Sequence, residues 1–244
     1  MGLSKGLNKA AAIRGGILQQ PDTQRRYLVA SLSHAFTKAV EWGFMDAHPF
    51  KGEVRLDGEQ PRTRYVEDWE IIEALQLPAM RKRGSVGAIH AYIWLKLLTG
   101  LRRGNFLRLR ATNCAADGIK VTTSKTGRPV VYEWTPELRT AVDAAKAARP
   151  VDISPLLFCN DSGECYVNEE TGDARGRSSM WQRFMARLLK ETAIKERFTE
   201  HDLRAKVASD AESLERARQL LAHADSRITQ RVYRRHPKRI KPTK

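Results

Sequence analysis

Apolar residues recur with helical spacing along much of this chain. The first such stretch begins near Gln24 and ends before Gly43, and every fourth position along it is apolar. This spacing places the apolar side chains on one face of a helix. The residues of the stripe are Leu28, Leu32, Phe36 and Val40. The pattern therefore predicts an N-terminal amphipathic helix that buries this face.

A charged segment follows at 51–64, and its glycines and proline, without sustained periodicity, mark it as a linker. Helical stripes resume at 65–75, where Trp69 and Ile72 define the apolar face. The stretch 88–98 is apolar nearly all round, as is expected of a buried helix. These patterns predict two lobes joined by the linker, the second with a buried helix near its start.

Strand signals appear at 118–123 and 128–134, and residues 125–127 between them suit the turn of a hairpin. Pro136 begins a further helix that extends to about residue 148, because proline is favoured in the first helical turn. The chain is therefore expected to be mainly α with a small antiparallel β-sheet, an α+β fold.

The C-terminal part returns to helical patterns after an unpatterned stretch at 151–177. One helix is expected at 181–191, and another begins after Thr199, whose hydroxyl is suited to cap its first turn. This last helix carries His201 and Arg204 on one face, one turn apart. It is the first candidate for chemistry.

The charge of the chain narrows the class of partner. The chain contains 43 Lys and Arg and 28 Asp and Glu, which gives a formal net charge of +15. The excess is spread along the chain and is not confined to one amphipathic helix. A polyanion, and nucleic acid before others, is therefore the expected partner.

Cysteine usage and hydropathy exclude several other classes of protein. The 3 cysteines form no CxxC pair, so neither a structural zinc site nor a disulfide framework is indicated. No apolar run approaches the length of a membrane span, and no signal peptide is recognised. We therefore expect a cytoplasmic protein with no metal, no cofactor and no membrane partner.

Short motifs rich in polar and charged residues lie far apart in the second lobe. They are TGLR at 99–102, SKTG at 124–127, HDLR at 201–204 and LLAH at 220–223, followed by Tyr233. Together they resemble the tyrosine recombinase family, the phage integrases and their relatives, over roughly residues 62–236. The ordered set is far more specific than any one of its motifs.

The resemblance implies DNA cleavage by a tyrosine nucleophile without metal or ATP. Arg102 and Arg204 would bind the non-bridging phosphate oxygens, for which planar, permanently charged guanidinium groups are suited. Tyr233 would attack the phosphorus and form a 3′-phosphotyrosyl link. A free tyrosine has a pKa of about 10, so it needs a proton acceptor or a strongly positive site. Its neighbours Arg231, Arg234 and Arg235 favour a phosphate nearby.

Three further positions match the family's pattern. Lys125, in the expected hairpin turn, would protonate the leaving 5′ oxygen, although an ordinary exposed turn also explains a lysine there. His201 and His223 would complete the site, although a lone histidine is more often structural than catalytic. Their place in the motifs favours the catalytic interpretation.

Two positions depart from the family's pattern. Asn105 stands where the family usually has an acidic residue, so no negative charge orients a neighbour from this position. Ala222 replaces the usual glycine before the second histidine, a mild change unless the backbone there requires a positive φ. Neither change removes a reacting group, so we expect an effect on rate and not on reaction type.

The resemblance also implies a domain organisation. Residues 1–50 would form a reduced helical core-binding lobe, 51–64 the linker, 65–236 the catalytic domain and 237–244 a basic tail. The two lobes would clamp double-stranded DNA. Monomers would assemble into a homotetramer on DNA, with or without accessory DNA-bending proteins, in a prokaryotic cell or a phage-infected host.

We therefore expect a site-specific recombinase, an integrase that cleaves and rejoins DNA. A type IB topoisomerase would use the same chemistry without a defined target site. A degenerate relative would bind DNA without cutting it. An RNA-binding protein is a weaker alternative, because it leaves the ordered series of Arg, Lys, His, Arg, His and Tyr unexplained.

Overall fold

The computed structural model describes a large part of the chain, which divides by its internal contacts into two compact units. The described residues are 22–51, 62–79, 85–123, 127–223 and 225–235. Unit 1 is Met1–Gln60 and unit 2 is Pro61–Lys244. Most of the expected linker, and the whole of the expected basic tail, lie outside the described residues.

The described part of unit 1 is built on one long helix, α2 (Asp22–Glu41). Its Val29 is buried together with Phe50, which lies after the helix. Phe36 meets Phe50 edge to face, with ring centroids 5.1 Å apart. Leu28, expected on the buried face, is 38% exposed. The expected helix is confirmed, and Leu32 and Phe36 of the expected stripe pack against this cluster, but Val29 is buried in place of Leu28.

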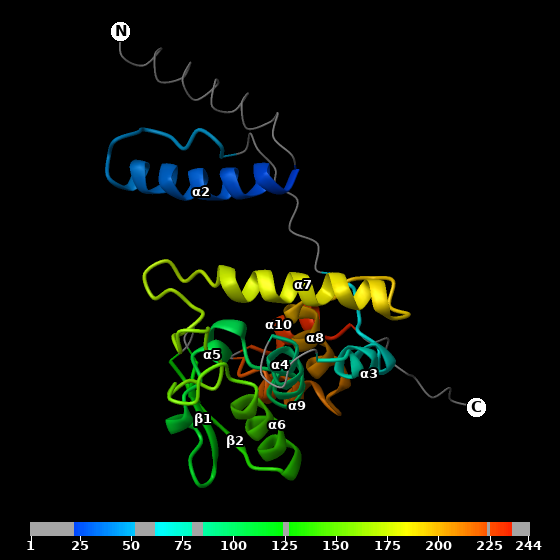
Figure 1. Ribbon diagram of the computed structural model, residues 1–244. Helices are drawn as coiled ribbons and strands as arrows, with labels where there is room; N and C mark the ends of the chain where they lie inside the picture. Colours follow the sequence, from blue (N-terminus) through cyan, green and yellow to red (C-terminus); the bar gives the residue numbers. More distant parts are fainter. Residues whose placement is uncertain (1–21, 52–61, 80–84, 124–126, 224, 236–244) are drawn as a thin grey trace, which may run out of the picture. The chain divides into compact units, whose positions relative to one another are not determined.

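Helix α4 (Ser85–Thr99) lies at the centre of unit 2 (Figure 1). It contacts α6 (Pro136–Ala147), α7 (Arg175–Glu191) and α8 (Glu200–Asp210). Its side chains are buried on several sides, as the nearly continuous apolar sequence predicts. The core of unit 2 therefore forms around this helix.

Helix α3 (Asp68–Gln76) buries a different face from the one that its sequence predicts. Trp69 and Ile72 are 47% and 53% exposed, whereas Glu70 is buried. The Glu70 carboxylate is paired with the guanidinium of Arg64. The expected face was wrong because hydrophobic periodicity does not register a buried polar residue whose charge is paired by a residue outside the helix.

The small sheet is the expected hairpin. Strand β1 (Gly118–Thr122) pairs antiparallel with β2 (Pro129–Glu133), and Ile119 lies opposite Tyr132. The hydroxyl of Tyr132 donates a hydrogen bond to the carbonyl oxygen of Leu220 at 3.0 Å. This bond ties the hairpin to the C-terminal helices, and the mainly α fold with a small antiparallel sheet is confirmed.

Short elements complete unit 2 and lead to the candidate nucleophile. They are α5 (Arg103–Leu107), η1 (Ala111–Asn113), α9 (Leu214–Leu220), α10 (Ser226–Ile228) and the π-helical turn η2 (Thr229–Tyr233). Both α9 and η2 contact α8. Isolated π-helical turns occur frequently at functional sites, and this one ends at Tyr233.

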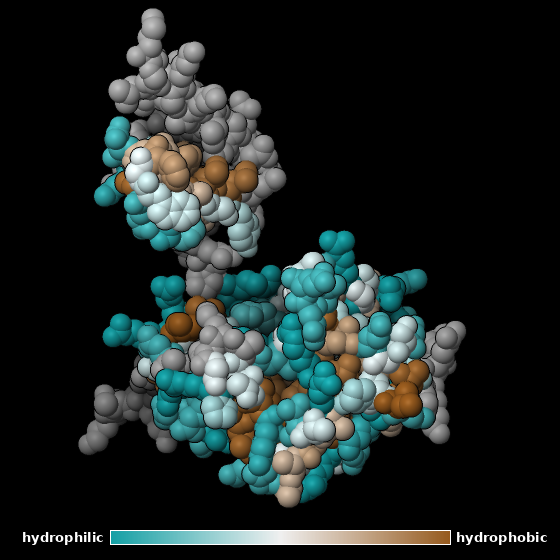
Figure 2. All heavy atoms as spheres, turned by 90° about the vertical axis from the view of Figure 1, so that its left-hand side faces the viewer, coloured by the Kyte–Doolittle hydropathy of each residue, from teal (hydrophilic) through white to brown (hydrophobic). Residues whose placement is uncertain are grey.

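The face of unit 2 that Figure 2 shows is mainly polar. Hydrophilic residues cover most of its area, and hydrophobic residues form smaller patches. Within the described ranges, no helix combines the length and the apolar character needed to cross a lipid bilayer.

Candidate active site

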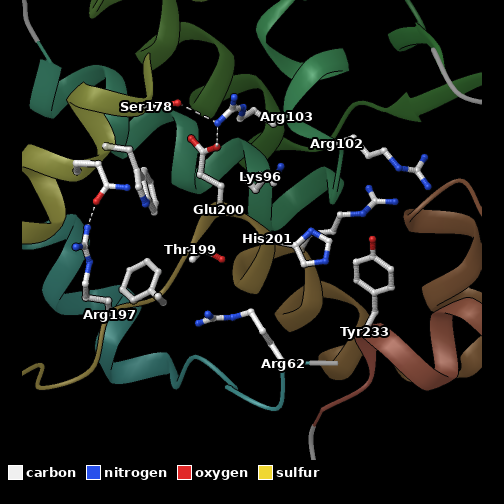
Figure 3. Close-up of a pocket in the computed structure, with 14 residues that line it drawn as sticks. Arg62, Lys96, Arg102, Arg103, Ser178, Arg197, Thr199, Glu200, His201 and Tyr233 are labelled. Atoms are coloured by element: carbon white, nitrogen blue, oxygen red, sulfur yellow. Dashed lines mark hydrogen bonds and ion pairs between the residues drawn. The ribbon is translucent and has the colours of Figure 1, made fainter. Parts of the chain in front are cut away.

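Unit 2 contains a pocket of about 630 Å³ with a strongly basic lining (Figure 3). Its cationic residues are Arg62, Lys96, Arg102, Arg103, Arg197 and Arg204. His201 and Tyr233 also line it, so four of the expected catalytic residues meet at one pocket although they are distant in sequence. Among the described lining residues, Glu200 supplies the one carboxylate. Such a lining suits an anionic ligand.

The N-terminal cap of α8 fixes where His201 and Arg204 lie. The Thr199 hydroxyl accepts a hydrogen bond from the Asp202 backbone N–H at 3.2 Å. The Asp202 carboxylate accepts one from the Thr199 backbone N–H at 2.8 Å. This reciprocal capping box satisfies two backbone donors that the helix itself cannot satisfy. The expected cap at Thr199 is confirmed, and it holds the first turn rigid.

Arg204 is buried and is held by three acceptors. Its guanidinium donates to the carbonyl oxygens of Gly100 and of Leu221, the latter at 2.7 Å. It also lies 2.9 Å from Nε2 of His223. Because a guanidinium can only donate, this nitrogen is the acceptor, and neutral His223 carries its proton on Nδ1. That Nδ1 lies 2.8 Å from the hydroxyl of Thr229.

Arg204 is charged although one of its nitrogens lacks a hydrogen-bond partner among the described residues. Its Nε is buried and has no hydrogen-bond partner within the described part of the chain. Burial lowers the pKa of Arg204 to about 10, with an opposing effect of Tyr233, so the guanidinium stays charged at neutral pH. Leaving a buried charged donor unpaired is unfavourable.

Tyr233 lies against both histidines. Its ring centroid is 5.0 Å from that of His201 and 5.0 Å from that of His223. The guanidinium carbon of Arg204 is 5.4 Å from the same ring centroid. The hydroxyl points into the pocket toward the side where Arg102 lies (Figure 3). The phenol thus faces a strongly positive region of the pocket.

His201 is an uncharged imidazole beside Tyr233. Partial burial and the nearby cations Arg235 and Arg204 lower its pKa to about 4. The imidazole is therefore neutral at physiological pH, and the same shift makes its nitrogen less basic than that of a free histidine. His223 differs, since its Nε2 accepts the hydrogen bond from Arg204. The two histidines thus have different surroundings, since His201 lies beside the phenol ring and His223 binds the guanidinium of Arg204.

A tight turn between α4 and α5 brings Arg102 to the pocket. Gly100 has a φ of +62°, which residues with a side chain rarely adopt. A Cβ added at Gly100 would lie 2.8 Å from Cδ2 of Leu221. The backbone here therefore packs directly against the C-terminal end of α9. The TGLR motif is the turn that makes this close approach and presents Arg102.

Lys125 lies outside the described residues, so its position and role stay predictions. The residues that flank it close the hairpin. The Thr123 backbone N–H donates to the carbonyl oxygen of Arg128 at 3.0 Å, and the Gly127 N–H donates to that of Thr123 at 2.8 Å.

The two departures from the family's pattern have different consequences. Asn105 is buried on α5, while Glu200 provides a carboxylate 3.2 Å from Arg177 and 3.8 Å from Arg103. Ala222 has a φ of +49°. The backbone at this position therefore requires a positive φ, which glycine adopts easily and alanine does not. The backbone before His223 is consequently strained.

Sequence reasoning missed Lys96, an enclosed cation of the pocket. Its side chain is buried on α4, and Nζ lies 5.6 Å from the ring centroid of Tyr92. Burial lowers its pKa to about 7. The signal that could have found it is a single lysine in a mainly apolar helix. Within the ranges that the structure describes, no group of His, Cys, Asp or Glu is arranged to hold a metal ion.

Comparison with known proteins gives one family match and several structural matches. The model of the Phage integrase family matches residues 73–239. A lambda integrase fragment, solved as a dimer bound to a COC′ core site, has a TM-score of 0.72 and 17% identity over 96% of this chain and 83% of that chain. No curated protein sequence matches this chain.

Two other solved structures share the fold. The Tn1549 transposon integrase, in complex with circular intermediate DNA, has a TM-score of 0.66 and 16% identity over 98% of this chain and 82% of that chain. The XerA recombinase has a TM-score of 0.55 and 17% identity over 96% of this chain and 87% of that chain. At such identities these likenesses establish the fold alone.

Proposed function

This chain belongs to the phage integrase family, and we propose that it is a site-specific recombinase that cleaves and rejoins double-stranded DNA through Tyr233. The convergence of Tyr233 with His201 and Arg204 in one basic pocket supports this most directly. A tyrosine nucleophile needs a proton acceptor or a positively charged site. The neutral imidazole of His201 would supply the first, and the guanidinium of Arg204 the second.

Cleavage begins when the Tyr233 oxygen attacks the phosphorus of the scissile phosphodiester. A bond from phosphorus to the phenolic oxygen forms, and the bond to the 5′ oxygen breaks. The phenolic proton passes to neutral His201, and the leaving oxygen takes a proton from Lys125. The strand then carries a 3′-phosphotyrosyl link.

Arg102 and Arg204 stabilise the charge that develops on the non-bridging oxygens. The two carbonyl oxygens and His223 that hold Arg204 fix its orientation before the substrate arrives, so little reorganisation is needed in the transition state. The Arg204 guanidinium, which lines the pocket, would donate to a non-bridging phosphate oxygen. Support for this role comes from the burial of Arg204, because the attraction is stronger away from water.

Rejoining reverses the chemistry. The 5′ hydroxyl of another strand attacks the phosphotyrosyl phosphorus and releases Tyr233, so the bond energy is kept and no ATP is required. Exchange between two duplexes requires a cut in each of the strands. We therefore propose that monomers assemble into a homotetramer on DNA, as lambda integrase does on a Holliday junction.

The domain organisation belongs to the same proposal. Residues 1–50 would contact DNA as a helical lobe opposite the catalytic domain at 65–236, with 51–64 as the link. The basic tail at 237–244 would contact the DNA backbone or a neighbouring subunit. The protein would act in the cytoplasm of a prokaryotic or phage-infected cell.

A nicked suicide substrate tests the proposal. Duplexes made from the DNA that flanks the gene carry a nick near each candidate cleavage point, so that the short cleaved fragment diffuses away and the covalent complex accumulates. We expect the wild-type protein to form an adduct that survives denaturation, and Tyr233→Phe to bind the same duplex without forming one.

The other outcomes separate the alternatives. An adduct that persists in Tyr233→Phe would exclude this residue as the nucleophile. A wild-type protein that binds these duplexes but never forms an adduct would be a degenerate DNA-binding relative. Relaxation of supercoiled DNA without a defined target site would identify a topoisomerase.

A further inference from the structure

Arg235 follows Tyr233 closely and is enclosed by protein, although its sequence context favours a phosphate contact. Its side chain is 4% exposed, and its guanidinium lies 2.5 Å from a carboxylate oxygen of Asp202. The same guanidinium donates to the carbonyl oxygen of Arg64 at 2.7 Å. A side chain with these partners and this burial is not available to DNA.

A second anchor joins the backbone of the same segment to α8. The Arg235 backbone N–H donates to the Ser209 hydroxyl oxygen at 2.7 Å. That hydroxyl lies 3.0 Å from the carbonyl oxygen of Tyr233 and 2.8 Å from that of Ala205. Its one proton serves one of the two oxygens at a time. The backbone on both sides of Arg234 is thus held against the helix that carries His201.

The first anchor is the ion pair between Arg235 and Asp202, and it is shielded from water. The Asp202 side chain is fully buried, and Arg62, which also binds it, is 53% exposed. Arg235 is therefore the cation that neutralises this carboxylate away from water, where an unpaired charge would be highly unfavourable. The same carboxylate caps α8 through Thr199. The end of η2 and the start of α8 are consequently fixed to each other.

We propose that Arg235 is a positioning residue for Tyr233, which holds the phenol against His201 by tying the end of η2 to Asp202 and Ser209 of α8. The inference rests on the proposed function. The turn η2 is only 5 residues long, and so short an element has little stability of its own. Without the two anchors the phenol samples many positions, and a displacement of about 1 Å from the attack geometry can lower a rate about 100-fold.

Two reactions distinguish positioning of the phenol from general support of the pocket. The first is adduct formation on the suicide duplex, which needs Tyr233. The second uses the same duplex with its 3′-phosphate esterified to p-nitrophenol in place of tyrosine. There the 5′ hydroxyl attacks the phosphorus and p-nitrophenolate leaves, so the phosphate site is needed but the phenol of Tyr233 is not.

We expect Arg235→Gln to slow single-turnover adduct formation at saturating DNA about 100-fold, and to leave ligation of the p-nitrophenyl strand unchanged. Arg235→Lys should recover part of the loss, because an ammonium still pairs with Asp202. The matched control is Arg139→Gln, which removes the same charge from an exposed arginine stacked on Trp134. It should behave as the wild type in both reactions.

Equal losses in both reactions would overturn the inference, since Arg235 would then support the pocket as a whole. Unchanged adduct formation in Arg235→Gln would overturn it as well. Should that variant fail to fold, Ser209→Ala takes its place, because it removes the second anchor and keeps the ion pair. Selective loss of adduct formation is again expected. A wild-type protein without any adduct would overturn the proposed function and this inference together.

Discussion

Lys96, Arg177 and Arg204 are almost completely enclosed within unit 2. The two arginines have specific partners, since Arg177 lies 3.2 Å from Glu200 and Arg204 binds His223. A guanidinium keeps its charge on burial, whereas an ammonium loses its proton much more readily. Lys96 is accordingly the group whose pKa burial lowers to about 7.

We expect Lys96→Met to raise the free energy of unfolding at pH 6 by about 2 kcal/mol, because a buried charge is replaced by an apolar chain of similar size. The folded pKa of about 7 lies below the value of about 10.4 for an unfolded lysine. The cost of the charge is therefore complete below pH 7 and disappears as the pH rises toward 10. Urea unfolding at pH 6 and at pH 9.5 measures the difference.

An advantage of Lys96→Met that is the same at both pH values would show that Lys96 does not titrate in this range. The control is Lys146→Met, which changes a half-exposed lysine paired with Asp143 on α6. It should give no pH-dependent gain between these two conditions.

At the scale of elements, the end of α9 is the structure that orients His223. The His223 backbone N–H donates to the carbonyl oxygen of Arg218 at 3.0 Å, and the Ala222 N–H donates to that of Gln219 at 2.9 Å. These two bonds form a Schellman motif, whose left-handed position usually holds glycine. Alanine occupies it here with a φ of +49°. The turn is kept by its hydrogen bonds and by the contact of His223 with Arg204.

We expect Ala222→Gly to raise the free energy of unfolding by about 1 kcal/mol, because glycine adopts the left-handed conformation without steric strain. Ala211→Gly is the matched control. Ala211 also follows a helix, α8, but its φ is −61°, so glycine there should destabilise the protein through a more flexible unfolded chain. Denaturant titration measures both variants, and a loss of stability in Ala222→Gly would contradict the account.

At the scale of the whole molecule, positive charge is spread along the chain and is also concentrated in the pocket. The net charge is +15, and the pocket gathers cationic side chains from separate parts of the chain. The dispersed charge attracts DNA from a distance, and the pocket fixes one phosphate among many. Affinity and chemistry therefore depend on different cations.

Binding to duplex DNA should weaken steeply with salt. Phosphate contacts release counterions from DNA, so affinity falls as a power of the salt concentration. Raising KCl from about 50 mM to about 200 mM should lower the affinity at least about 100-fold. Fluorescence anisotropy with a labelled duplex measures this. A nearly flat dependence would mean that few phosphates are contacted and would contradict the electrostatic account.

The sequence by itself determined the mainly helical fold, the hairpin and the cap at Thr199. Each of these features is local, because hydrophobic spacing and capping residues act within a few turns of the chain. The ordered motifs also identified the family, and the catalytic roles assigned from them stay predictions. Four of the candidate residues line one pocket, a placement that requires the whole fold.

Only the tertiary structure decided which polar groups are enclosed and what they contact. Glu70 on the inner face of α3, the pairing of Arg235 with Asp202 and the strain at Ala222 each depend on a partner or a backbone path set by packing. Periodicity averages the polarity of a segment and contains no information on a partner many residues away. A buried charge is stable only with that partner, so such a position can be recognised only once the chain has been folded around it.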